Sequence, residues 1–319
     1  MESNSALRLI KVLDKLKGAN ANTPIAKVIK EIFNDDEESR IGVHIGQIFT
    51  LSNTVHKQVL ALPDFDPENL RADPIENRLF KPMRSVYEMG SIFKIFNTAL
   101  AFENGIDKEY YVKEPFKIPD KSGRTAAKIS DIRSFKPPRP NLTVEEIMVH
   151  SCNVGSAQIA LDLPDDAQKE FFERLHMDGP LDLEFGRTER TLLPKKWGPV
   201  ERATVAFGHG ISVTPMHLLL AMNAVTNGGI YIYPTLQKRS VGVVHGERVL
   251  ADEISAKLRP IMLRVAEETS GKKARVAGIQ IGGKTATRPI PSLFTIKTAE
   301  QSLKIQTLRR EYPMLSGIR

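Results

Sequence analysis

The stretch that decides the fold is residues 87–103, Tyr-Glu-Met-Gly-Ser-Ile-Phe-Lys-Ile-Phe-Asn-Thr-Ala-Leu-Ala-Phe-Glu. The segment after Gly90-Ser91 is strongly apolar, so the sequence predicts a helix that is buried in the protein. Residues three apart share one face of a helix, which places Lys94 over Ser91 within one turn. The segment therefore predicts a core helix with a serine and a lysine paired at its beginning.

This serine–lysine pair suits nucleophilic catalysis. A serine hydroxyl needs a neighbouring base, and a lysine that an apolar helix shields from water can lose its proton near neutral pH. Free N–H groups at the start of the helix point to where an oxyanion would form. The alternative is that Ser91 caps the helix and Lys94 is exposed, and this motif alone leaves both open. A second Ser-x-x-Lys, residues 270–273, lies in a polar stretch without a predicted helix.

A second motif, Ser151-Cys152-Asn153, is the only Ser-x-Asn in the chain. In a turn between two helices, its hydroxyl and amide can face one site. The hydroxyl would relay a proton between Lys94 and a leaving amine, and the amide would hold a substrate peptide group. A capping pair between the helices is the alternative. No base pattern surrounds Cys152, so a packing role is favoured over a nucleophilic one.

A third motif, Lys284-Thr285, follows the expected strand Ile279-Gln-Ile-Gly-Gly283, whose glycines permit close backbone approach. On an edge strand beside the nucleophile, Lys284 and Thr285 would bind a substrate carboxylate. The N–H groups of Thr287 and Ser91 would together form an oxyanion hole. Another Lys-Thr-Ala, residues 297–299, lacks this context.

Periodicity and turn signals outline the other elements. An apolar central helix, a helical middle and flanking strands indicate an α/β or α+β fold with an antiparallel sheet. Residues 111–141 are expected to form a long loop with short strands, and Thr143 to Glu146 is a capping box. Further helices are expected at 6–33, 143–150, 153–161, 166–177, 214–225 and 251–268, and strands at 41–51, 57–62, 230–233, 240–244 and 275–282.

Composition narrows the class of protein. The chain has 319 residues, of which 41% are hydrophobic and 26% charged, as in ordinary globular proteins. Its net charge of +7 is scattered, which disfavours a nucleic-acid site. One cysteine allows no internal disulfide, and the 7 histidines form no metal-binding pattern. We expect no metal or other cofactor. The sequence shows neither a signal peptide nor a run of apolar residues long enough to span a membrane.

With the three motifs in this order, the chain resembles the transpeptidase domain of class B penicillin-binding proteins, close to the cell-division peptidoglycan D,D-transpeptidases. The resemblance extends from about residue 41 to 287. It includes other stretches that are similar to family signatures: residues 62–67, 77–78, 87–94, 194–198, 206–215 and 227–229. It implies the penicillin-binding, serine β-lactamase-like fold: an antiparallel sheet flanked by helices, with a helical subdomain.

The resemblance also implies an activity and its residues. Ser91 would be the acylated nucleophile, Lys94 its general base, Ser151 the proton relay and Asn153 a substrate-binding group. Lys284 and Thr285 would recognise the terminal carboxylate of a D-Ala-D-Ala stem peptide or of an inhibitory β-lactam. An acyl-enzyme would then be aminolysed by a neighbouring stem peptide. Divisome proteins and a glycosyltransferase would be partners, at the outer, periplasmic face of the bacterial cytoplasmic membrane.

The sequence departs from the family pattern after Lys284-Thr285. Ala286 replaces a glycine, so its methyl is expected to point into the site or perturb the strand, and Arg288 replaces a small residue. The residues that follow are expected to form a polar helix, with the C-terminal strands truncated. We therefore expect a helical stalk remnant at 1–40, a transpeptidase domain at 41–288 and a divergent tail at 289–319. Alternatives to an active transpeptidase are a non-enzymatic relic and, less favoured, a serine β-lactamase.

Overall fold

The computed structural model describes most of the expected catalytic region. Several sequence predictions lie outside the described residues: the helix at 6–33, the strand at 240–244, residues 275–280 of the expected strand before Lys284, and the tail up to residue 312. Strands β1, β2 and β12, defined below, are described as backbone. The described residues are 42–49, 55–62, 81–132, 135–184, 186–235, 245–269, 281–287 and 313–318.

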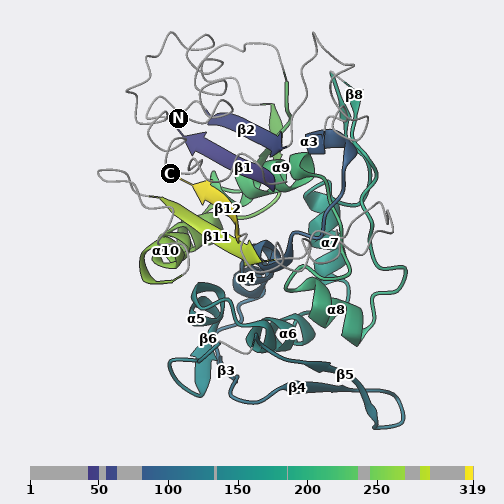
Figure 1. Ribbon diagram of the computed structural model, residues 1–319, viewed down its shortest axis with the longest axis vertical. Coiled ribbons are helices and arrows are strands. Elements are labelled where there is room, and N and C mark those ends of the chain that lie inside the picture. Colours follow the sequence, from purple (N-terminus) through teal and green to yellow (C-terminus); the bar gives the residue numbers. More distant parts are fainter. Residues whose placement is uncertain are drawn as a thin grey trace, which may run out of the picture.

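A four-stranded sheet, in the order β11-β12-β1-β2, forms one side of the molecule (Figure 1). Strands β1 (Gly42–Phe49) and β2 (Val55–Leu62) form the antiparallel hairpin that the sequence predicts. Strand β11 (Gly282–Thr287) pairs antiparallel with β12 (Pro313–Ile318), whereas β12 and β1 run parallel. The sheet is therefore mixed, because the central β12–β1 pair does not follow the antiparallel expectation.

The expectation that no sheet strand follows Lys284-Thr285 is wrong for residues 313–318. Strand β12 pairs with β11 along its whole length and also with β1, with Ser316 opposite both Lys284 and Ile45. The polar residues that precede this segment indicated a helix, and the strand after them was therefore not predicted. Strand pairing uses backbone groups that every residue except proline supplies in full, and Pro313 stands at the first strand position, where proline is tolerated.

The helix expected from residues 87–103 is present, but it begins at Gly90, and its first turn is a 3₁₀ helix, which is wound more tightly than an α-helix. Residues 90–93 form a 3₁₀ turn, η3 (Gly90–Phe93), which continues into α4 (Lys94–Glu103). Seven apolar side chains of η3 and α4 are buried: Ile92, Phe93, Ile95, Phe96, Ala99, Leu100 and Ala101. Phe93, Phe96 and Phe172 pack edge to face around the helix, with ring centroids 5.3, 5.6 and 6.3 Å apart. This geometry suits aromatic pairs in a core.

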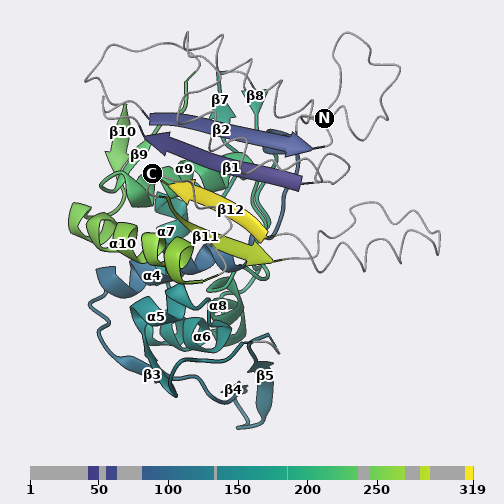
Figure 2. The same cartoon turned by 60° about the vertical axis from the view of Figure 1, so that its left-hand side comes forward.

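Two long helices join this core to the sheet. Helix α10 (Asp252–Glu268) packs against β11 and α4, and α9 (Pro215–Thr226) packs against β1, β2 and α10. Figure 2 shows α10 running alongside β11, with α4 on its other side. Both helices agree with the sequence prediction, including Thr214, whose side chain accepts from the N–H of His217 at the N-terminus of α9.

A mostly helical subdomain lies on the far side of α4 from the sheet (Figures 1 and 2). The long segment predicted at 111–141 does carry short strands, which form the β4–β5 hairpin and part of the β3–β6 pair. The subdomain consists of β3 (Glu109–Tyr111), β4 (Phe116–Pro119), β5 (Thr125–Ile129), β6 (Asn141–Thr143), α5 (Val144–Val149), α6 (Asn153–Asp162) and α8 (Pro199–Val205). Helix α7 (Ala167–Arg174) packs against α4.

The smaller described elements lie around this framework. A helical turn precedes the core segment, and two pairs of short strands follow α7 and α9. These elements are α3 (Lys81–Arg84), β7 (Asp182–Leu183), β8 (Gly186–Arg187), β9 (Ile230–Ile232) and β10 (Gly246–Arg248). In the described part of the chain, no helix combines the length and the apolar character that crossing a bilayer requires.

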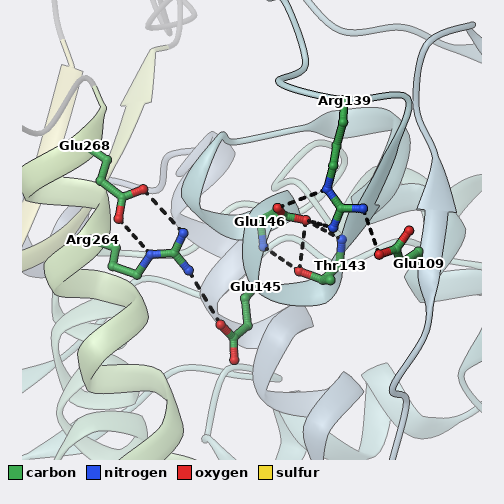
Figure 3. Close-up of polar contacts among 7 residues, drawn as sticks. All are labelled: Glu109, Arg139, Thr143, Glu145, Glu146, Arg264 and Glu268. Carbon is green, nitrogen blue, oxygen red and sulfur yellow. Dashed lines mark hydrogen bonds and ion pairs between the residues drawn. The ribbon is translucent and has the colours of Figure 1, made fainter.

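The predicted capping box at the start of α5 is confirmed and is extended by an arginine (Figure 3). The N–H of Glu146 donates to Thr143 Oγ1 at 3.2 Å, and the N–H of Thr143 donates to Glu146 Oε2 at 2.9 Å. Arg139 pairs with Glu146 at 2.6 Å and with Glu109 at 2.7 Å, which links α5 to β3. The side chain that caps the helix is thus itself held in place.

A second polar contact in Figure 3 connects α10 with α5. Arg264 lies 2.8 Å from Glu268 on its own helix and 3.6 Å from Glu145 on α5. All three side chains are partly exposed, so each pair contributes little, typically below about 1 kcal/mol. Packing of apolar side chains, not these ion pairs, holds α10 against the core.

Arg202 of α8, by contrast, is a buried cation with a structural role. Its side chain ends at the C-terminus of α6, where Nη2 donates to the carbonyl oxygens of Ala160, Leu161 and Leu163 at 3.0, 3.3 and 2.9 Å. Nη1 contacts Asp165. These carbonyl groups have no partner within the helix, and the positive charge is favourable at this end of the helix dipole.

We expect Arg202→Met to lower the free energy of unfolding by about 2–4 kcal/mol, because it leaves buried carbonyl groups of α6 without donors. Urea denaturation followed by circular dichroism measures this. Arg187→Met is the matched control, since that guanidinium pairs with Asp182 at the surface and should change stability by less than about 0.5 kcal/mol. Equal effects of the two substitutions would contradict the role assigned to Arg202.

Candidate active site

The local backbone presents Ser91 at the start of the core helix. Gly90 has φ +55°, in the left-handed region, and Gly208 has φ +80°. A Cβ on Gly208 would lie 2.1 Å from the carbonyl oxygen of Gly90, so only glycine allows this close approach. In the 3₁₀ turn that follows, residues three apart eclipse each other, which aligns Lys94 with Ser91 more directly than an α-helix would.

Lys94 is buried, with 1% of its surface exposed, and its amine is surrounded by oxygen atoms. Nζ donates to the carbonyl oxygens Asn153 Oδ1 at 2.6 Å and Ser151 O at 2.7 Å. The hydroxyl oxygens of Ser91 and Ser151 lie 2.9 and 3.2 Å from Nζ. The structure therefore brings the first two predicted motifs together around one amine.

This arrangement fits a neutral amine. A neutral lysine has two N–H groups and one lone pair, and the two carbonyl oxygens can only accept. With both N–H groups used there, the lone pair is left for the hydroxyl proton of Ser91. Burial lowers the pKa of Lys94 to about 8, against the opposing charge of Asp131. The alternative of an exposed Lys94 beside a capping serine is not what the structure shows.

Ser151 adopts a backbone conformation that serine rarely takes. It has φ +60° and follows the last residues of α5, where its N–H donates to Met148 O at 3.2 Å and the N–H of Cys152 donates to Ile147 O at 3.0 Å. Together these bonds form the Schellman motif, which usually has glycine at the left-handed position. A residue with a Cβ is strained there by about 1–2 kcal/mol. The hydroxyl oxygen at this strained position is one of the oxygen atoms that surround the Lys94 amine.

Lys284, a residue of β11, also contacts the side chain of Ser151. It is fully buried, and its Nζ lies 2.8 Å from Ser151 Oγ and donates to Thr285 O at 3.1 Å. Burial and then the charge of Lys94 hold the pKa of Lys284 well below its usual value. Ser151 Oγ thus lies between two amines, which is the geometry that a proton relay needs. Carboxylate binding by Lys284 and Thr285 stays a prediction, as both are buried in this structure.

The methyl group of Ala286 does not perturb the strand. Its residue is 2% exposed and packs in the main core, and strand pairing continues through Ala286 opposite Met314. A Cβ built on Gly90 would lie 3.7 Å from the Cβ of Ala286, an ordinary contact distance. The expectation of a strand perturbed by Ala286 is therefore wrong, because this side chain packs in the core without interrupting the pairing of β11 with β12. Thr287, the other proposed oxyanion donor, ends β11 opposite Pro313.

The segment before α9 also borders the 3₁₀ turn that carries Ser91. The N–H of Gly210 donates to Glu88 Oε1 at 3.1 Å, and His209 Nδ1 lies 3.6 Å from Glu88 Oε2. Burial and the charge of Lys94 lower the pKa of His209. This segment therefore supports the turn from outside the core helix.

Sequence reasoning missed Asp131. Its carboxylate accepts from the N–H of Asn153 and, at 3.2 Å, from the thiol of Cys152. Cys152 in turn caps α6, since its sulfur accepts from the N–H of Gly155 at 3.2 Å, and burial raises the pKa of its thiol. The packing role expected for Cys152 agrees with this. Asp131 belongs to none of the three motifs and lies in the segment interpreted as a loop, so no local signal marked it.

Among the described residues, no three histidine, cysteine, aspartate or glutamate side chains gather in a way that would hold a metal ion.

We expect Ser151→Gly to be more stable than Ser151→Ala by about 1 kcal/mol, because both lose the hydroxyl but only glycine relieves the left-handed backbone. Denaturant midpoints of the two purified variants provide the comparison. An alanine variant at least as stable as the glycine variant would show that Ser151 is not strained.

Comparisons with known proteins identify the family of this chain. Residues 48–290 match the family model described as the penicillin binding protein transpeptidase domain. A "Probable peptidoglycan D,D-transpeptidase FtsI" from Caulobacter vibrioides is 32% identical over 252 residues, which cover 77% of this chain and 40% of that protein. "Stage V sporulation protein D" from Bacillus subtilis is 31% identical over 264 residues, 76% of this chain and 40% of that protein. The chain thus spans about two fifths of the length of these relatives.

Solved structures share the fold. Penicillin-binding protein A from M. tuberculosis superposes with a TM-score of 0.67 at 18% identity, covering 91% of this chain and 73% of that one. A peptidoglycan glycosyltransferase from Burkholderia ambifaria gives a TM-score of 0.60 at 22% identity, covering 72% and 68%. With the family model matched across most of the sequence and this fold, the chain belongs to the family of penicillin-binding protein transpeptidase domains.

Proposed function

We propose that this chain is the catalytic domain of a serine D,D-transpeptidase, which cross-links peptidoglycan stem peptides through an acyl-enzyme on Ser91. The observation that carries the proposal is the position of the Lys94 amine, which lies 2.9 Å from Ser91 Oγ and donates to the carbonyl oxygens of Ser151 and Asn153. A nucleophile within hydrogen-bond distance of a buried base is the arrangement that acyl transfer requires. The names of the FtsI relatives support the same activity.

In the proposed acylation, Ser91 Oγ attacks the carbonyl carbon of the D-Ala-D-Ala peptide bond while its proton passes to Lys94. The N–H groups of Ser91 and Thr287 stabilise the oxyanion of the tetrahedral intermediate. As the carbon–nitrogen bond breaks, Ser151 donates its proton to the leaving D-Ala amine and regains one from protonated Lys94, which lies 3.2 Å away. Asn153 orients the stem peptide, and Lys284 and Thr285 bind the terminal carboxylate.

Deacylation reverses these steps with a different amine. The amino group of a neighbouring stem peptide loses a proton through Ser151 to Lys94 and attacks the ester carbonyl of acylated Ser91. The ester bond breaks, and Ser91 regains its proton from Lys94. The product is a peptide cross-link, and no net proton is gained or lost by the enzyme. A β-lactam would acylate Ser91 in the same way, with its ring nitrogen as the leaving group.

A non-enzymatic role was the main alternative from the sequence, on the grounds of an incomplete sheet and Ala286. Strand β12 pairs with every residue of β11, and Ala286 packs in the core without breaking the strand. These two observations favour the enzyme. For the whole protein, we propose work at the outer face of the cytoplasmic membrane, with a glycosyltransferase and divisome proteins as partners.

Fluorescent penicillin should label the purified protein covalently, and Ser91→Ala should abolish the label because the nucleophile is lost. Gel fluorescence after denaturation measures this. Ser270→Ala is the matched control from the other Ser-x-x-Lys and should label as the wild type does.

The lifetime of the adduct separates the two enzymatic alternatives. A transpeptidase should keep the label for many minutes when no acceptor amine is present, whereas a β-lactamase would hydrolyse it rapidly. A wild-type protein that forms no adduct dependent on Ser91 would refute the proposed activity.

The rate of acylation should rise with pH and level off above about 8, because only neutral Lys94 can accept the proton of Ser91 and its pKa is about 8. Below that pH the rate constant should fall about tenfold per pH unit. Stopped-flow acylation by a penicillin between pH 6 and 10 tests the profile, and Lys94→Arg should lose at least about 100-fold at every pH. A profile that declines across this range would rule out Lys94 as the base.

A further inference from the structure

Asp131 lies where the backbone of the catalytic turn meets α6. It follows β5, and its two carboxylate oxygens accept from different groups: Oδ1 from the N–H of Asn153 and Oδ2 from the thiol of Cys152 at 3.2 Å. The side-chain amide of Asn153 also lies 3.4 Å from the carbonyl oxygen of Ser130. A segment from the β4–β5 hairpin therefore holds the residues that follow Ser151.

The turn at Ser151 needs such support because it is strained. On its N-terminal side, the Schellman hydrogen bonds to Ile147 and Met148 hold it. On its C-terminal side, Asp131 binds the next two residues. Within this turn, Ser151 and Asn153 supply the oxygen atoms that contact the Lys94 amine. The position of those oxygens relative to Lys94 thus depends on how Asp131 places the turn.

Asp131 also contributes charge. Lys94 is shielded from water, and the groups around it are Lys284 from β11, His209 from the segment before α9, and Cys152 from the start of α6. Two of these three are basic, whereas Asp131 is an anion that favours the protonated form of Lys94. Its charge opposes the effect of burial on Lys94.

We propose that Asp131 is a positioning residue for acylation: it holds the 151–153 turn against Lys94, and its negative charge stabilises the protonated form that Lys94 takes when it accepts the proton of Ser91. This inference rests on the proposed function for its kinetic consequences. The placement of the turn and the charge beside Lys94 are properties of the fold and can be measured without catalysis.

Asp131→Asn and Asp131→Ala separate the two contributions. The asparagine keeps an acceptor oxygen for the N–H of Asn153 but removes the charge, so the midpoint of the acylation pH profile should fall by roughly 0.5–1 unit. The alanine also removes the acceptor, so the plateau rate at high pH should fall roughly tenfold or more, as expected for a misplaced catalytic turn. Asparagine should restore most of that plateau.

Asp162→Asn is the matched control. Asp162 stands at the opposite end of α6, where it accepts from Tyr110 Oη at 2.7 Å and pairs with Lys108. Its substitution should leave both the midpoint and the plateau unchanged. If Asp131→Asn has the wild-type midpoint, the electrostatic part of the proposal is wrong, and if folded Asp131→Ala has the wild-type plateau, the positioning part is wrong.

A titration without substrate keeps this inference distinct from the proposed function. In protein labelled with ¹³C-lysine, the ε-carbon resonance of Lys94, assigned as the signal that Lys94→Arg removes, should titrate at lower pH in Asp131→Asn than in the wild type. A wild-type protein that is not acylated would refute the proposed function, and the NMR midpoints would still decide the role of Asp131. Equal midpoints would overturn the electrostatic part of the proposal.

Discussion

The burial of one amine, that of Lys94, is the constraint on which the rest of the site depends. A lysine side chain within a core helix is costly when charged, so the protein either surrounds it with oxygen atoms or lowers its pKa. This structure does both. Carbonyl oxygens from Ser151 and Asn153 take the N–H groups, and burial lowers the pKa to about 8. The desolvation that makes Lys94 a base therefore also requires the turn between α5 and α6 to lie beside the amine.

The supports of this arrangement are backbone features that would be unfavourable elsewhere. Gly208 approaches the carbonyl oxygen of Gly90 more closely than any side chain would allow, and Ser151 takes a left-handed conformation that suits glycine. Strain of this kind persists only where surrounding structure holds it. Here α5, Asp131 and β11 all contact the turn or its side chains.

Much of the fold was predictable because its elements carry local signals. The apolar run after Ser91, the capping box at Thr143 and the Thr-Pro start of α9 each indicate a helix from a few neighbouring residues. The predictions that failed concerned long-range pairing or short geometry. Strand β12 was missed because its partners lie far away in the sequence, and the 3₁₀ turn at Gly90 was missed because hydrophobic periodicity does not distinguish it from an α-helix.

The site divides in the same way. The sequence alone determined which chemical groups are present and in what order: a serine three residues before a lysine, a single Ser-x-Asn, and a Lys-Thr after a predicted strand. Spacing on one helix even placed Lys94 beside Ser91. Only the tertiary structure decided that Lys284 shares Ser151 with Lys94, that Asp131 binds the turn, and that Ala286 packs in the core without interrupting β11. The physical reason is that the burial of a side chain and the charges around it depend on elements that lie far apart in the chain. A local sequence pattern therefore does not predict how completely a side chain is removed from water.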